Sequence, residues 1–112
     1  MSGWETDRLK SRVRVQALIR HFDRQNIPAV VRRSGDDDAG ALLIVIDRRE
    51  GDLSILSEVR NLDGALEWSE RRLAENENLP EILEKQVDFD PDIWIIDIDD
   101  PDSRVTIDGI VV

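Results

Sequence analysis

Six consecutive apolar residues, Ala41–Ile46, constrain this chain more than any other feature of its sequence. A strand with one solvent-exposed face alternates apolar and polar residues, whereas an unbroken apolar run of this length is typical of a strand buried on both faces. Residues 35–40 and 47–52, which flank the run, are rich in glycine and aspartate and predict turns. We therefore predict a central strand in a sheet that is covered on both sides.

Other segments supply the neighbours of that strand. Four of them have the length and the apolar or alternating pattern of strands: Ala29–Arg33, Leu53–Val59, 65–69 and Asp92–Asp100. Asp63-Gly64 predicts the hairpin turn that leads into an edge strand at 65–69. Residues 105–112 are a candidate for one more edge strand.

The N-terminal part of the chain changes its hydrophobic period. Residues 11–15 alternate charged and apolar side chains, which predicts a short strand. A helix over 16–26 follows, because apolar residues recur there at helical spacing: Val15, Leu18, Ile19 and Phe22. The alternative is a single helix over 7–26, in which Leu9 and Val13 lie off the apolar stripe.

A second helix is predicted to begin at Asn78. Glu81 stands three residues later, the spacing of a capping box, and Pro80 falls in the first turn, where proline is tolerated. The predicted element order is β-α-β-β-β-β-α-β. It indicates an α+β fold in which two helices pack on a mostly antiparallel sheet.

The length of 112 residues fits a single domain, and we assign residues 1–112 to it, with 1–7 as an N-terminal segment expected to be flexible. The absence of cysteine excludes disulfides, thiolate metal sites and cysteine nucleophiles. The longest apolar run is far shorter than the ~20 residues of a membrane helix, and the N-terminus lacks a signal-peptide pattern. We expect a soluble, cytoplasmic bacterial protein without a membrane partner.

Charge is distributed unevenly along the chain. The formal net charge is −10, with residues 1–33 at +5 and residues 34–112 at −15. A free-standing nucleic-acid binder needs a net basic face, so this class of function is disfavoured. The basic side chains near the N-terminus have only Phe22 as a neighbouring aromatic residue, which is too little for a base-stacking platform.

Acidic residues near the C-terminus are the candidates for a metal site. Asp90, Asp92, Asp97 and Asp99 could supply carboxylate oxygens to a hard divalent cation. The spacing does not match a calcium loop, however, because Ile93 stands where that loop requires glycine. Solvated acids at turns and strand ends are the alternative interpretation, and we assign no resident metal and no other cofactor.

The chain has few side chains suited to acid–base or nucleophilic catalysis. The chain has one histidine, His21, and no tyrosine, and its serines show no nucleophile motif. We therefore assign no catalytic residue, although a metal-dependent hydrolase or nuclease that uses the four aspartates remains an alternative. A small-molecule ligand is not indicated by any motif.

Several segments together resemble a known family. Ala17-Leu18-Ile19-Arg20, Arg33–Gly40, Trp68, Gln86 and Asp90–Trp94 occur in the order and at the spacing of a small alphaproteobacterial family, domain of unknown function 1491. The resemblance covers about Leu9 to Asp100 and implies a small single domain. It implies no activity, ligand or catalytic residue.

Our leading hypothesis is a non-enzymatic module that binds another protein or self-associates, through a sheet edge or a face that carries Trp68. The interaction residues that we assign are Trp68, Asp36, Asp38, Arg20 and Arg33. A weaker alternative is an acidic mimic of a nucleic-acid duplex that binds a DNA-binding protein. It requires spaced acids on one helix or sheet face.

Overall fold

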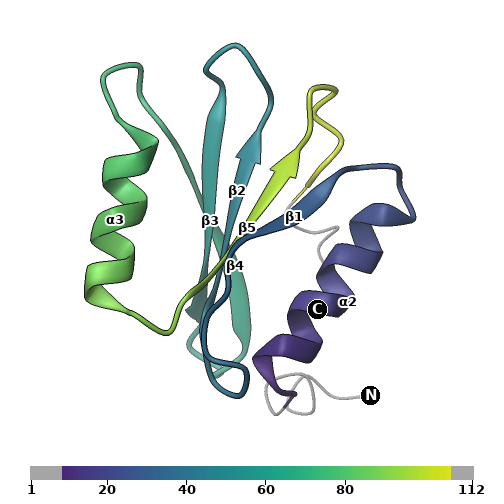
Figure 1. Cartoon of the computed structure of the whole chain (residues 1–112), viewed down its shortest axis with the longest axis vertical. Helices are drawn as coiled ribbons and strands as arrows, with labels where there is room; N and C mark the ends of the chain where they lie inside the picture. The colour runs from purple at the N-terminus through teal and green to yellow at the C-terminus, as the bar shows by residue number, and fades with distance from the viewer. Residues whose placement is uncertain (1–8, 107–112) are drawn as a thin grey trace.

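The fold consists of two helices and a five-stranded sheet, seen in a computed structural model that describes residues 9–106 (Figure 1). The elements in chain order are α2 (Ser11–Asp23), β1 (Ala29–Arg33), β2 (Leu42–Asp47), β3 (Leu53–Arg60), β4 (Leu66–Arg72), α3 (Leu79–Phe89) and β5 (Trp94–Asp99). The α+β class is therefore confirmed. No helix in this part of the chain is long and apolar enough to cross a membrane.

The sheet is mostly antiparallel, as predicted, but it contains one parallel pair of strands and is therefore mixed. Its strand order is β1-β5-β2-β3-β4, so the last strand inserts between the first and the second. β5 runs parallel to β2 and antiparallel to β1. The parallel pair arises because α3 carries the chain from the end of β4 back across the sheet, a connection that a hairpin cannot make.

The central strand β2 is buried on both faces, as its apolar run predicts. Figure 1 shows α2 on one side of the sheet and α3 on the other. One core cluster lies under α2 and includes Leu18, Phe22, Ile44 and Ile96. A smaller cluster packs under α3, and because side chains alternate along a strand it takes Leu43 and Val45 of β2 and Ile95 of β5, together with Ile93 just before β5.

The predicted strand at residues 11–15 is wrong, because this segment forms the first turns of α2. The alternation of charged and apolar residues there suggested a strand, but the buried side chains follow helical spacing: Ser11, Arg14, Val15, Leu18 and Phe22. Arg14 faces the core although it is charged. Leu9 and Val13, which lie off the stripe, are exposed.

The second helix begins as predicted. Asn78 is its N-cap, and the Asn78 side chain accepts a hydrogen bond from the Glu81 backbone N–H at 3.1 Å. The edge strand predicted at 65–69 extends to Arg72. Of the candidate strand at 105–112, Val105 and Thr106 are not in a strand, and the remaining residues lie outside the described part of the chain.

Candidate functional site

The Gly35–Gly40 loop, rich in glycine and aspartate, and the Asp-Pro-Asp-Ile-Trp motif at 90–94 pack directly against each other. The loop Gly35–Gly40 lies so close to residues 90–94 that a Cβ on Gly35 would fall 2.1 Å from the carbonyl oxygen of Asp92. The Asp36 N–H donates to that same oxygen at 2.9 Å, and Trp94 Nε1–H donates to the Asp36 carbonyl at 2.7 Å. We call this contact, residues 35–40 with 90–94, the glycine–aspartate junction.

The same loop also caps the first helix. The backbone N–H groups of Ser11 and Arg12 donate to the carbonyls of Asp38 and Asp37 at 3.3 and 3.0 Å, and Ser11 Oγ–H donates to the Gly40 carbonyl at 2.6 Å. These bonds satisfy donors that a helix N-terminus otherwise leaves unpaired. Acidic residues near this positive end of the helix dipole add a favourable charge interaction. The junction therefore joins α2, the β1–β2 loop and the start of β5.

The structure does not gather the four aspartates of the predicted metal site. Asp97 pairs with Arg32 at 2.8 Å and Asp99 with Arg49 at 2.7 Å, while Asp90 accepts the backbone N–H of Asp92. The hydrogen bond from Arg49 holds the pKa of Asp99 below its ordinary value. Within residues 9–106, no three or more histidine, aspartate or glutamate side chains are placed to hold a metal ion.

Asp100, which points away from Asp99, is 1 % exposed and has a structural role. Its two carboxylate oxygens accept the backbone N–H groups of Arg104 and Val105, each at 2.9 Å. These bonds hold the turn that follows β5. A buried carboxylate that is fully engaged by backbone donors stabilises the fold and is not available for chemistry.

A buried ion pair that the sequence did not reveal connects α2 to the sheet. Arg14 and Glu58 are 9 % and 8 % exposed at their side chains, and Arg14 Nη2 lies 2.6 Å from Glu58 Oε2. Glu58 Oε1 also accepts the Leu42 N–H at 2.8 Å. Arg14 Nε is buried without a hydrogen-bond partner in the described chain. The only sequence signal was a charged residue at a helical position of the apolar stripe.

This ion pair lines a cleft of about 350 Å³. The cleft lies between the start of α2, residues 38–41 and the β3–β4 hairpin, with Leu9 and Leu66 among its apolar lining residues. Trp68 stands directly opposite Glu58 on the neighbouring strand. The ion pair thus brings the junction side of the molecule into contact with the hairpin.

The hairpin ends in a long, regular free edge. β4 is the last strand of the sheet and pairs in continuous antiparallel register with β3 from Leu66 to Arg72. Asn61 N–H donates to the Ala65 carbonyl and Leu73 N–H to the Leu53 carbonyl, both at 2.9 Å. Because an antiparallel pair bonds alternate residues, the odd-numbered residues of β4 bond to β3 and the even-numbered ones direct their N–H and C=O groups outward.

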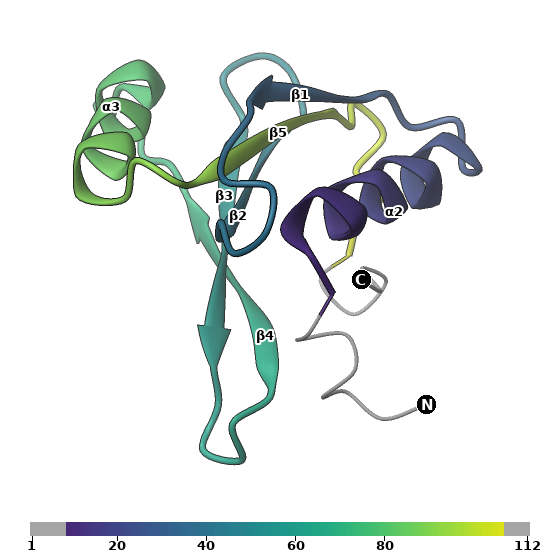
Figure 2. The same ribbon diagram turned by 60° about the horizontal axis from the view of Figure 1, so that its bottom comes forward.

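We call this outward side of Leu66–Arg72 the β4 edge. Within residues 9–106, no strand pairs with it. Trp68 is half-buried and packs against the core cluster under α2, so the side chains on that face are Leu66, Trp68, Glu70 and Arg72. Glu67, Ser69 and Arg71 point to the opposite face. Figure 2 shows the hairpin extending away from both helices.

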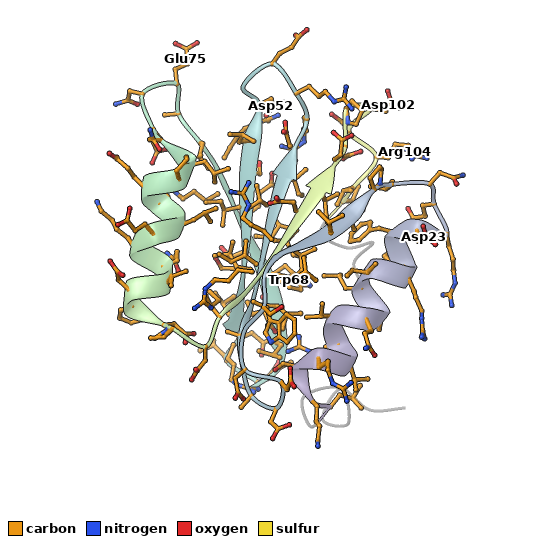
Figure 3. All side chains as sticks on the ribbon, in the orientation of Figure 1. Asp23, Asp52, Trp68, Glu75, Asp102 and Arg104 are labelled. Carbon is orange, nitrogen blue, oxygen red and sulfur yellow. The ribbon has the colours of Figure 1, made fainter. Side chains whose placement is uncertain are left out.

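Ion pairs engage three charged side chains of β4, Glu70, Arg71 and Arg72, while no strand of the described chain pairs with its outward backbone groups. Glu70 accepts Ser54 Oγ–H at 2.8 Å and pairs with Arg48 at 3.2 Å, and Arg72 pairs with Asp52 at 2.8 Å. The hydrogen bond from Arg72 lowers the pKa of Asp52 from its ordinary value. Figure 3 shows Asp52 beside the β2–β3 turn and Trp68 nearer the other end of the sheet.

The predicted interaction residues do not form one patch. Trp68 lies at the β4 edge, whereas Asp36 belongs to the glycine–aspartate junction and Arg33 borders it, with Arg33 Nη1 donating to the Ile93 carbonyl at 2.8 Å. Asp38 faces Lys10 beside the start of α2, at 3.6 Å, and Arg20 is exposed on α2. Glu67 and Arg71 were not among the predicted residues, although their opposite charges flank Ser69 symmetrically along the strand.

Comparisons with known proteins agree with this fold. A family model described as a protein of unknown function, DUF1491, matches residues 9–108. A crystal structure of a DUF1491 family protein from Caulobacter crescentus CB15 is 36% identical, with a TM-score of 0.77 over 93% of this chain and 95% of that one. None of the curated proteins matches the chain.

Two structures determined in solution are also similar. An NMR structure of a DUF1491 family protein from Caulobacter crescentus CB15 is 36% identical, with a TM-score of 0.68 over 87% of this chain and 90% of that one. The protein Atu0922 from A. tumefaciens is 27% identical, with a TM-score of 0.69 over 82% and 86% of the two chains. The resemblance that the sequence motifs suggested is confirmed.

Proposed function

This chain belongs to the family of proteins of unknown function designated DUF1491, and we propose that it is a non-enzymatic protein-binding module that binds through the β4 edge. The observation that carries the proposal is a seven-residue edge strand in unbroken register, with its outer backbone groups unpaired by any described strand. Such an edge is a template on which a partner can add a strand to the sheet.

Trp68 gives this edge an apolar anchor. Its indole is half-buried beside Leu66 and the core cluster under α2. Tryptophan contributes a large contact area at interfaces, because most of its ring is apolar while its N–H can still donate. A strand added at the β4 edge would cover the exposed part of this ring.

The opposite edge of the sheet is a poorer template. β1 has five residues, and its register with β5 shifts between Val31 and Arg33. A bulge of this kind twists a strand and interrupts the regular spacing of its backbone groups. The length and regularity of β4 therefore favour it over β1 as the binding edge.

The carboxylates of the chain support binding over metal chemistry. Asp97 and Asp99 pair with arginines and Asp90 accepts a backbone N–H, and within residues 9–106 no three or more acidic or histidine side chains are placed to hold a metal ion. The duplex-mimic alternative has only the α3 acids Glu81, Glu84 and Asp88 on one helix face, and Lys85 borders them. Neither alternative has an observation that favours it over the β4 edge.

Site-specific photo-crosslinking tests the proposal. We would place a photoreactive phenylalanine analogue at Ser69 in β4, or at the exposed Glu84 of α3 as the control, and irradiate Caulobacter crescentus cells that make the chain. We expect a protein adduct from position 69 that position 84 does not give. The adduct should disappear in Glu70→Pro, which removes an outward N–H and no N–H that bonds to β3. Equal adducts from both positions, or none from position 69, would refute the proposal.

A further inference from the structure

The direction of the backbone groups limits how two β4 edges can pair. Only even-numbered residues of β4 direct their N–H and C=O groups outward. In an antiparallel pair of two copies, even residues must therefore bond to even residues. A two-fold axis between the copies then passes beside a residue of β4, never between two residues.

Charge selects one of these axes. With the axis beside Ser69, Glu67 of each copy lies directly opposite Arg71 of the other copy, and no like charges face each other. An axis beside Glu67, Glu70 or Arg71 would set two identical charges opposite one another, which is destabilising. An axis beside Trp68 would leave Glu67 opposite Ser69 with no charge pair. Ser69 is also the midpoint of β4, so this axis gives the longest overlap.

The apolar residues agree with the same axis. With the axis beside Ser69, Trp68 lies opposite Glu70 of the second copy, and the two Trp68 side chains become diagonal neighbours on one face. Diagonal neighbours are ~7–8 Å apart, which is within reach of aromatic side chains. The half-buried Trp68 of each copy would thus be covered at the centre of the interface.

The side chains that form the charge pairs are accessible. Glu67 and Arg71 are both exposed, and Arg71 contacts Glu77 through Nη2. A guanidinium group has five N–H donors, so Arg71 can keep Glu77 and still donate to Glu67 of a second copy. The hairpin extends away from both helices, so neither helix covers the outer half of β4 (Figure 2).

We propose that the partner at the β4 edge is a second copy of this chain, paired antiparallel about a two-fold axis beside Ser69, so that one sheet runs through both copies. This inference rests on the proposed function, because it identifies the occupant of the same edge. A single strand pair is smaller than the ~1,600 Å² of a standard stable interface, so we expect a weak dimer with a dissociation constant in the micromolar range or above.

Charge reversal with rescue tests the register. Sedimentation velocity over roughly 10 μM to 1 mM, a range set by the expected affinity, compares the natural chain with Glu67→Arg, Arg71→Glu and the double variant. Each single reversal should weaken dimerisation roughly tenfold, because it places like charges opposite each other twice. The double variant should regain the original dissociation constant. Residues 67 and 71 lie roughly 13 Å apart along one strand, so rescue within a single chain is excluded.

The matched control reverses Glu84 and Lys85 on α3, which carry one acid and one base at exposed positions outside the β4 edge. This variant should dimerise like the natural chain, and thermal melting should show that all variants remain folded. A monomer at every concentration, unchanged dimerisation in the single variants, or a double variant that stays weak would each overturn the second-copy inference. A monomer that still gives a position-69 adduct with a different protein would overturn this inference and leave the proposed function standing.

Discussion

The glycine–aspartate junction and the β4 edge use polar residues in opposite ways. At the junction, loop and strand backbones approach too closely to admit a Cβ, and the polar groups of Asp36 and Trp94 bond within the chain. Along the β4 edge, ion pairs hold the side chains while alternate backbone groups face outward. The residues that carry the family resemblance at the junction therefore maintain the fold. The proposed binding surface depends instead on the position of a strand and the order of its charges.

Breaking the link between these two regions is expected to have the largest effect. Arg14→Ala removes the cation from Glu58 and leaves a buried carboxylate that, among residues 9–106, keeps the Leu42 N–H as its partner. The free energy of unfolding should fall by about 3–4 kcal/mol, measured by urea denaturation. Arg12→Ala, at the exposed neighbouring position of α2, should change it by less than about 0.5 kcal/mol. A loss of unfolding free energy below about 1 kcal/mol in Arg14→Ala would contradict a stabilising role for the Arg14–Glu58 ion pair.

A methyl group added at the junction tests how closely its backbones pack. Gly35→Ala would place a Cβ 2.1 Å from the Asp92 carbonyl oxygen, so the loop must shift, at a cost of about 2–3 kcal/mol in unfolding free energy. Gly51→Ala is the comparison, because Gly51 has a φ of 81° and nothing within 4 Å of its added Cβ. Backbone strain alone should cost it about 1 kcal/mol. Equal losses in the two variants would show that the junction tolerates the extra atom.

Substituting the tryptophan of each region should affect a different property of the protein. Trp94→Phe removes the N–H that bonds the Asp36 carbonyl at 2.7 Å, and it should cost about 1–2 kcal/mol of unfolding free energy. Trp68→Phe should cost less than about 1 kcal/mol, because this side chain is only half-buried. Under the second-copy inference, Trp68→Phe should weaken dimerisation while Trp94→Phe should not. Urea denaturation gives the unfolding free energy and sedimentation gives the dimerisation of the same samples. A larger loss of stability in Trp68→Phe, or weaker dimerisation in Trp94→Phe, would contradict the different roles assigned to the two tryptophans.

The smallest expected effect is on the pKa of Asp52, which pairs with Arg72 of β4 and contributes to the stability of the fold at acid pH. The hydrogen bond from Arg72 lowers the pKa of Asp52, so the Asp52–Arg72 pair stabilises the fold above the ordinary aspartate pKa. This contribution is lost as pH falls through the lowered pKa. In Arg72→Gln, NMR titration of the Asp52 carboxyl carbon should show a pKa closer to the ordinary value of about 3.9. Arg20→Gln, on the exposed surface of α2, is the control and should leave the pKa of Asp52 unchanged.

Local sequence patterns predicted the elements whose stability depends on near neighbours. The capping pair Asn78–Glu81, the Asp63-Gly64 turn and the strand at Leu42–Asp47 all occur where the sequence predicts them. The segment at 11–15 was mispredicted because its alternation is a local pattern, whereas the position of Arg14 depends on Glu58, 44 residues away. The aspartates were misleading for the same reason, since their arginine partners are distant in sequence.

Composition and hydrophobic period by themselves determined that this chain is a small α+β domain with one strand buried on both faces. The absence of cysteine excluded thiol chemistry. Only the tertiary structure decided that β5 lies between β1 and β2, which leaves β4 as an outer strand and brings Asp97 to Arg32. The physical reason is that turns and helices form from contacts between close neighbours. Strand order and ion pairing instead depend on the joint packing of residues far apart in the chain.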